Sequence, residues 1–310
     1  MTSCPEIVVE RAAAAVGRRI LDNAAVTTPE SVAATGFAVR RAAADGTSLL
    51  DLSLQAAEMA LDGFDRASIG GVVCATFSHA DRFPALAVKV AGALSLPRDI
   101  PALDLQMACS AYPYAVYAAG RLAADSGKPV LVVDGDIQSR LVDGSDPSTA
   151  PLFSDAATAS VVTSSAASGA VSRFSFLSSR SDALQCPAGG PVGMDGFKVF
   201  SFVASDVVRL LREFGDRFDM FIPHQANMYM VRQLAKSLGL TEKLLTCGAE
   251  YANPGSCSIP LAVAAHGRAG RALLAGFGAG FSAAACTVRL AGGVAAGVSA
   301  ETAAEEGAGK

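Results

Sequence analysis

Three residues far apart in this sequence have side chains suited to acyl transfer: Cys109, His224 and Asn253. Each lies where a predicted strand runs into a predicted helix. A thiol can take up an acyl group, and an imidazole and a carboxamide can hydrogen-bond a carbonyl. Their types and their common setting predict a site for acyl-transfer chemistry.

Cys109 stands in the segment DLQMACSAYPY, after a short apolar run and before a predicted helix. The first N–H groups of a helix are unpaired and carry partial positive charge, which stabilises a thiolate. We therefore expect a lowered pKa for this thiol. The ordinary alternative is an inert core residue, because free cysteines behave as small buried hydrophobic side chains.

His224 and Asn253 both lie beside turn-forming residues. His224 comes directly after the apolar segment FDMFIP, and Asn253 begins an Asn-Pro-Gly turn ahead of an alanine-rich helix. Taken singly, the histidine could be a capping residue and the asparagine only part of a turn. The presence of all three residues favours the catalytic interpretation.

The elements that must position these residues alternate between strands and helices, which indicates an α/β protein with a mainly parallel sheet. Strands are predicted at 69–77, 101–108, 129–135, 158–163, 218–223, 271–277 and 281–290. Helices are predicted at 49–61, 110–124, 197–214, 227–239 and 256–267. Reactive groups of such proteins gather at the carboxyl ends of the strands, where Cys109 and His224 are expected.

Composition restricts the possible partners. The 310 residues are 51% hydrophobic, with a formal net charge of −4, and no cluster of Lys and Arg is interleaved with aromatics, so nucleic acid is not expected. The start of the chain does not resemble a signal peptide, and no apolar run approaches the roughly 20 residues that cross a bilayer. The seven cysteines form no CxxC pair and no zinc-ligand spacing. We therefore expect a reduced, cytoplasmic protein without a membrane segment or a metal site.

Two glycine- or alanine-rich segments need a separate interpretation. GFGAGF at 276–281 resembles a dinucleotide-binding loop, but a strand pattern follows it instead of a helix, so a tight hairpin or a close backbone approach to a ligand is expected. Residues 164–191 are expected to contain the crossover between two halves and an exposed loop. Residues 291–310 show no periodicity and are predicted to form a disordered tail.

Longer motifs resemble one known family. They are TG at 35–36, FP at 83–84, FSDAA at 153–157, MDGFKVF at 194–200, PHQAN at 223–227, NPGSCSIP at 253–260 and GFGAGF at 276–281. Together with the segment around Cys109, they resemble the thiolase-fold condensing enzymes, specifically β-ketoacyl-acyl-carrier-protein synthase III. The resemblance covers roughly residues 31 to 290.

The resemblance implies a fold and an assembly. The fold is a thiolase-like α/β arrangement of two pseudo-twofold-related halves in five layers, αβαβα, with the active site between the halves. Residues 1–165 would form the half that carries the Cys nucleophile, and residues 166–290 the half that carries His and Asn. A homodimer without a cofactor is implied.

The resemblance also implies roles for the three candidate residues. Cys109 would accept the acyl group from a thioester donor. His224 and Asn253 would hydrogen-bond the thioester carbonyl of a malonyl-type extender as carbon dioxide leaves. An oxyanion hole would be formed by the backbone N–H groups of Cys109 and Ala279.

Further residues would contact substrates or the carrier protein by the same resemblance. Those expected to bind substrate are Phe83, Phe153, Gly278 and Phe281, with Phe83 reaching across the dimer; ordinary core packing is the alternative for Phe83 and Phe153. Arg232 and Lys236 would bind acidic acyl carrier protein.

Departures from the family pattern bear on the acyl donor. Members that use acyl-CoA carry a Trp and an Arg just before the TG pair, where this sequence has Glu30 and Ala34. The Arg expected after the Asp-Pro pair is missing, and Ser201 replaces a basic residue. The loss of stacking and cationic contacts weakens CoA binding, so a carrier-bound donor is favoured.

Three functions remain open at this stage. The leading hypothesis is decarboxylative condensation in a specialised pathway, for a secondary metabolite or a surface polysaccharide. The second is acyl transfer to a hydroxyl or amine without decarboxylation. The third is a non-catalytic partner subunit of a heterodimeric synthase, which the presence of all three candidate residues argues against.

Overall fold

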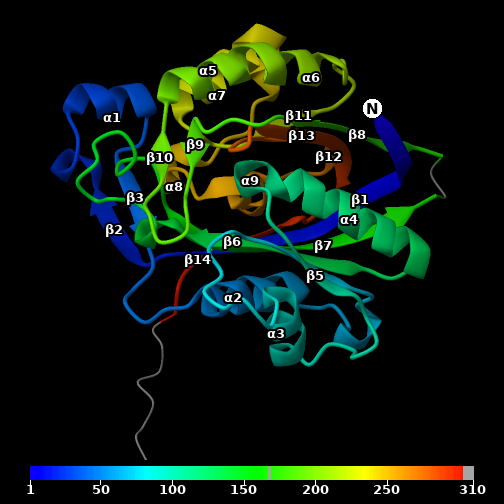
Figure 1. Cartoon of the computed structure of the whole chain (residues 1–310). Coiled ribbons are helices and arrows are strands. Elements are labelled where there is room, and N and C mark those ends of the chain that lie inside the picture. Colours follow the sequence, from blue (N-terminus) through cyan, green and yellow to red (C-terminus); the bar gives the residue numbers. More distant parts are fainter. Residues whose placement is uncertain (167–168, 303–310) are drawn as a thin grey trace, which may run out of the picture.

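The computed structural model describes residues 1–166 and 169–302, and these fold into five alternating layers of helices and sheet (Figure 1). One sheet region contains, in order, β5 (Ala102–Leu105), β4 (Val72–Ala75), β6 (Val130–Ile137), β7 (Asp155–Ser165), β1 (Thr2–Val16) and β14 (Ala295–Ala300). The other contains β8 (Val171–Ser178), β13 (Ser282–Leu290), β12 (Gly270–Gly278) and β11 (Met220–Pro223). The α/β architecture predicted from the sequence is confirmed. The expectation of a mainly parallel sheet is wrong, because the sheet is mixed and its longest pairings, β1 with β7 and β12 with β13, are antiparallel.

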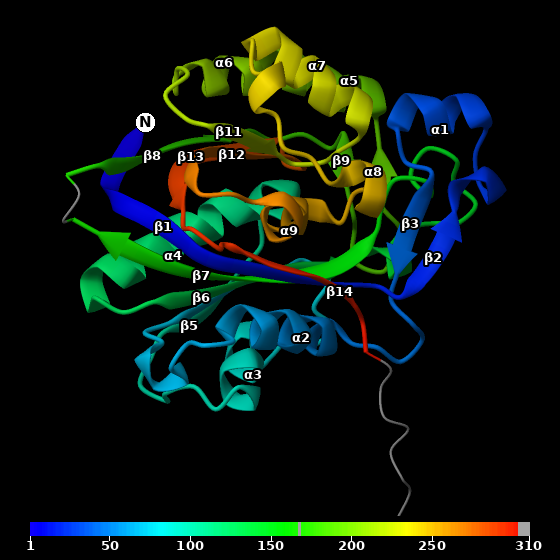
Figure 2. The same cartoon turned by 180° about the vertical axis from the view of Figure 1, so that it is seen from behind.

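Helices fill the three remaining layers, as the view from behind also shows (Figure 2). One outer layer contains α2 (Leu49–Leu61) and α3 (Leu86–Ala93), the middle layer α4 (Ala111–Ser126) and α9 (Ser258–His266), and the other outer layer α5 (Gly196–Phe202), α6 (Val208–Arg212) and α7 (Met228–Leu238). Smaller elements flank the layers: β2 (Arg19–Asp22), α1 (Pro29–Thr35), β3 (Val39–Ala42), β9 (Leu184–Gln185), β10 (Gly193–Met194) and α8 (Gly248–Tyr251).

The same pairing pattern occurs in both sheet regions. Strand β4 is parallel to β6, which is antiparallel to β7, and β7 is antiparallel to β1. Likewise β11 is parallel to β12, which is antiparallel to β13, and β13 is antiparallel to β8. Strand β1 joins the regions, because its start pairs with β8 and the rest pairs with β7. The repeated order supports two related halves, and their boundary at 165/166 stays a prediction.

Hydrophobic clusters on both faces of the sheet hold the layers together. Successive residues of β6 point to opposite faces, so Val130 and Val132 pack against the middle helices while Leu131 and Val133 pack against α2 and α3. Apolar residues all around α9 suit a helix buried between two sheets. Helix α4 approaches β1 so closely that a Cβ on Gly120 would lie 2.0 Å from Ile7 Cδ1.

Several sequence predictions need correction. The tail predicted to be disordered is wrong for residues 295–300, which form β14 in parallel pairing with β1; the rest of the predicted tail from residue 303 lies outside the described residues. Strands β1 and β8 were not predicted, and the helix predicted at 197–214 is α5 and α6 joined by a π-helical turn. These strands are held by long-range pairing, which leaves no strong local pattern.

The hairpin predicted around GFGAGF is confirmed, since β12 and β13 pair along their whole length. Among the residues described, no helix is long and apolar enough to cross a membrane.

Candidate active site

A tight turn places Cys109 at the start of α4. Residues Ala108–Ser110 form a single 3-10 turn between β5 and α4, and Ala108 has a φ of +41°, a left-handed conformation that non-glycine residues rarely adopt. The hydroxyl of Ser110 donates to the Met107 carbonyl at 2.9 Å and lies 2.7 Å from the Ser282 hydroxyl of β13. The nucleophile candidate is therefore held by both halves of the protein.

Two glycines of β12 allow the close approach of that strand to Cys109. A Cβ on Gly278 would lie 2.9 Å from Cys109 Cβ, and a Cβ on Gly276 would lie 2.9 Å from the Cys109 carbonyl oxygen. Side chains at these positions would push the cysteine away. The sequence singled out Gly278 as a substrate-binding residue, and the structure shows it directly beside the candidate nucleophile.

The environment of the Cys109 thiol favours its protonated form. Burial raises the pKa to about 12, with further contributions from the carboxylates of Asp136 and Asp134 on β6. The expectation that the helix start lowers this pKa is therefore wrong, because desolvation and two nearby acids outweigh it. For Cys109 to act as a nucleophile, its thiol would have to lose this proton.

His224 continues the parallel pairing of β11 with β12, because its N–H donates to the Ala275 carbonyl at 2.7 Å. Its ring is buried, with Nδ1 3.0 Å from the Gly255 carbonyl oxygen and 3.0 Å from the Ser258 hydroxyl. Burial lowers the imidazole pKa to about 4, opposed by the bond to Gly255. At neutral pH the ring is uncharged.

The two neighbours of Nδ1 select different tautomers of the neutral ring. The Gly255 carbonyl can only accept, so it favours a proton on Nδ1. The Ser258 hydroxyl accepts from the Gln225 N–H at 3.1 Å, which leaves its own proton available to donate to Nδ1. In that second arrangement Nε2 carries the proton and can donate to a substrate oxygen.

Asn253 is fixed by hydrogen bonds at both ends of its amide. Its Oδ1 accepts from the Gly255 N–H at 2.9 Å, and its Nδ2 donates to the Ala226 carbonyl at 3.3 Å. Gln138 donates to the Asn253 backbone carbonyl at 3.2 Å and also to the Ser154 carbonyl. These bonds orient the amide so that a second N–H remains for a ligand.

All three candidates line one buried cavity of about 80 Å³. Cys109, His224 and Asn253 contribute to its wall together with Gly278 and Phe153. The structure thus brings together side chains from β5–α4, β11–α7 and the turn before α9.

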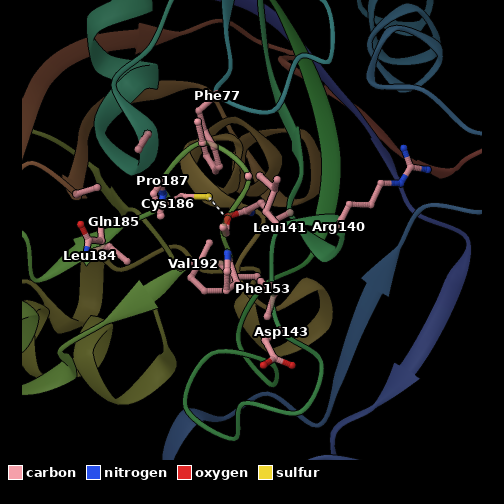
Figure 3. A pocket seen from close by; sticks show the side chains of 18 of the residues that line it. Phe77, Arg140, Leu141, Asp143, Phe153, Leu184, Gln185, Cys186, Pro187 and Val192 are labelled. Atoms are coloured by element: carbon pink, nitrogen blue, oxygen red, sulfur yellow. Dashed lines mark hydrogen bonds between the residues drawn. The ribbon is translucent and has the colours of Figure 1, made fainter.

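A larger cavity of about 780 Å³ adjoins the nucleophile (Figure 3). Cys109, Phe153 and Ala279 line it, so the proposed oxyanion residue Ala279 shares a cavity with the nucleophile. The loop at 184–192 forms another wall, where Cys186 Sγ lies 3.6 Å from the Gly190 carbonyl oxygen. The cavity is large enough for an acyl chain.

Two of the predicted substrate-binding residues, Phe83 and Phe281, line neither of these two cavities. Phe83 is 85% exposed and lines neither cavity. Phe281 stacks on Phe202 with ring centroids 4.4 Å apart, also outside both linings. Arg232 and Lys236 are exposed one turn apart on α7, a position from which they can contact a partner.

Sequence reasoning missed Gln138, Ser258, Asp134 and Asp136. The first of these follows β6 directly, so the rule that reactive groups gather at strand ends could have found it. In the part of the chain that the structure describes, no group of three His, Cys, Asp or Glu residues could hold a metal ion.

The fold and the site define a thiolase-fold acyl-condensing enzyme. Models of 3-oxoacyl-[acyl-carrier-protein] synthase III match residues 103–180 and, for its C-terminal part, residues 215–290. Beta-ketoacyl-[acyl-carrier-protein] synthase III of Shewanella oneidensis is 32% identical, over 82% of this chain and 88% of the relative, and that of Laribacter hongkongensis is 34% identical, over 81% and 87%. The chain belongs to the β-ketoacyl-[acyl-carrier-protein] synthase III family and is a transferase.

Solved structures agree with this assignment. The crystal structure of 3-oxoacyl-(acyl-carrier protein) synthase from Burkholderia xenovorans superimposes with a TM-score of 0.88 at 26% identity, over 96% of this chain and 98% of that one. The priming β-ketosynthase of the R1128 polyketide pathway superimposes with a TM-score of 0.84 at 28% identity, over 93% and 98%.

Proposed function

We propose that this enzyme transfers an acyl group to Cys109 and then condenses it with a malonyl-type thioester. The observation that carries the proposal is the meeting of Cys109, His224 and Asn253 on one buried cavity. A thiol, a neutral imidazole and a fixed carboxamide supply a nucleophile and two uncharged hydrogen-bond donors, which suits the binding of an enolate.

In the first half-reaction, the Cys109 sulfur forms a bond to the donor's acyl carbon, and the bond from that carbon to the donor sulfur breaks. The thiol proton leaves with the donor as its new S–H. The oxyanion formed on the way is held by the backbone N–H groups of Cys109 and Ala279, whose residues share the larger cavity.

In the second half-reaction, the malonyl C–C bond breaks and carbon dioxide leaves, with the electron pair passing into an enolate. His224 Nε2–H and Asn253 Nδ2–H donate to the thioester oxygen that carries the charge. The enolate carbon attacks the acyl carbon, the bond to Cys109 sulfur breaks, and the thiolate is reprotonated from solvent.

Three side-chain replacements separate the two half-reactions. Cys109→Ala should abolish acylation, seen as loss of the acyl mass shift in the intact protein. His224→Ala or Asn253→Ala should leave acylation in place and lower release of labelled carbon dioxide from malonyl carrier by about 100- to 1,000-fold, as expected for a lost donor.

The matched control is His266→Ala, since His266 lies at the end of α9 and pairs with Glu250. This variant should retain both half-reactions. Unchanged condensation in His224→Ala would refute the assigned role. Acylation without carbon dioxide release in the unmodified enzyme would favour transfer to a hydroxyl or amine, and no acylation at all would favour a non-catalytic subunit.

The proposal has three further parts. The substrates are carried on acyl carrier protein, the enzyme is a homodimer, and it serves a specialised pathway. Helix α1 presents Glu30 and Ala34 instead of groups that hold CoA, while α7 exposes Arg232 and Lys236 for an acidic carrier protein. The exposed Phe83 suits a dimer in which it enters the partner's cavity. The similarity to a polyketide priming enzyme supports secondary metabolism over surface polysaccharide, and seven free cysteines suit the cytoplasm.

A further inference from the structure

A further cavity, which contains one arginine, adjoins the larger cavity that Cys109 lines. We call the larger one the acyl cavity. The further cavity, of about 360 Å³, is lined mainly by apolar side chains and by one cation, Arg40 of β3. Phe153 and Val142 line both this cavity and the larger one that contains Cys109. The two cavities therefore adjoin at these two residues.

Arg40 is buried but incompletely paired. The residue is only 8% exposed. Its Nε donates to Asn23 Oδ1 at 2.6 Å. In the described parts of the chain no acceptor bonds its two terminal nitrogens. The carboxylate of Asp155 favours the charged form of Arg40 through space, but it makes its own hydrogen bonds with Ser139 and with the Ala43 N–H.

Neither terminal nitrogen is among the buried atoms that lack a partner, so both reach open space, where they can bond an anionic group of a ligand. The planar guanidinium, fixed at Nε, can offer both terminal nitrogens to one carboxylate in a bidentate contact. Asp22 also lines the cavity, but one of its oxygens already accepts from the Ala24 N–H, and the residue is exposed to solvent that screens its charge.

We propose that the Arg40 cavity binds a carboxylate at the far end of the acyl group, so that the enzyme selects ω-carboxyacyl donors. The inference rests on the proposed acylation of Cys109. An acyl chain attached there enters the larger cavity, passes between Phe153 and Val142, and places its terminal carboxylate on Arg40. The apolar lining of the second cavity accommodates the last methylenes.

The test measures acylation of Cys109 by intact-protein mass, with donors supplied as N-acetylcysteamine thioesters and on carrier protein. Each ω-carboxyacyl donor in a chain-length series is paired with the ω-methyl donor of the same length, and acetyl is the reference. At the chain length that spans the two cavities, the carboxylate donor should react about tenfold faster or more. Arg40→Met should remove the preference and leave the acetyl rate unchanged.

Arg40→Met could disturb folding through Asn23, so a second variant leaves the arginine in place. Ala25 is exposed and lines the cavity, and Ala25→Phe should block it and lower the rate with the carboxylate donor to that of the methyl donor. The matched control is Ala24→Phe, because Ala24 is exposed and does not line the cavity.

The possible results separate this inference from the proposed function. Acetylation of Cys109 without any carboxylate preference at any chain length overturns the inference and leaves the function standing. Absence of acylation by every donor overturns the function. An Arg40-dependent preference for carrier-bound over N-acetylcysteamine donors, the same for both acyl series, assigns the site to the carrier's phosphate and also overturns the inference.

Discussion

At the scale of single residues, the proposed chemistry depends on which ring nitrogen of His224 carries the proton. With the pKa lowered to about 4 the ring is neutral over the working range, and the Ser258 hydroxyl supports the tautomer that has its proton on Nε2. Ser258→Ala should therefore shift the ring toward the Nδ1-protonated form held by Gly255. Carbon dioxide release should fall about tenfold while acylation is retained.

Nitrogen-15 NMR distinguishes the two tautomers of the His224 ring directly, and the chain has only three histidines to assign. In the unmodified protein the His224 signals should titrate near pH 4, below the ordinary value of about 6.5. Because the neutral ring is the donor, condensation should decline as the pH falls toward 4. Unchanged nitrogen shifts in Ser258→Ala, or a midpoint near 6.5, would contradict this account of the site.

At the scale of elements, the close approach of β12 to the turn before α4 sets the position of the candidate nucleophile, Cys109. Gly278 has a φ of +157°, and a Cβ there would meet Cys109 Cβ at 2.9 Å. Gly278→Ala should displace the cysteine and lower the acylation rate by about 100-fold, since small misplacements of reacting groups are costly.

The control for this substitution is Gly92→Ala in α3, where an added Cβ meets nothing within 4 Å. This variant should keep its acylation rate and gain about 0.5–1 kcal/mol in free energy of unfolding, measured by urea denaturation. If Gly278→Ala acylates at the normal rate, contact between β12 and the turn does not position Cys109.

At the scale of the whole molecule, the enzyme is acidic overall yet exposes two cations on α7, in the outer layer beyond β11 and β12 (Figure 1). Reversing both, as Arg232→Glu with Lys236→Glu, should lower kcat/KM for acyl carrier protein about tenfold at low salt, with a smaller effect as salt is added. Donors without a carrier protein should react at the normal rate.

The matched control is Arg98→Glu with Lys128→Glu, which reverses two exposed cations that follow α3 and α4 and are not on α7. This variant should leave the carrier-dependent rate unchanged. An equal loss with both variants would show that overall charge, and not α7, governs the encounter with carrier protein.

Local sequence patterns predicted much of this protein. The alternation of apolar runs and alanine-rich segments predicted the α/β class, and the motifs around Cys109, His224 and Asn253 predicted the family. Helix α2 begins and ends at the predicted residues, because a capping box at Ser48 fixes its start. Such features are readable because their causes lie within a few residues of chain.

What the sequence determined is the identity of the candidate reactive side chains and the strand-to-helix junctions that carry them. The tertiary structure alone decided the pairing of β14 with β1, the pKa of Cys109, the competition for His224 Nδ1 and the position of Arg40 behind Phe153. Each of these depends on burial and on contacts between residues far apart in the chain. Desolvation and long-range packing have no local sequence pattern, so they can be read only from the folded molecule.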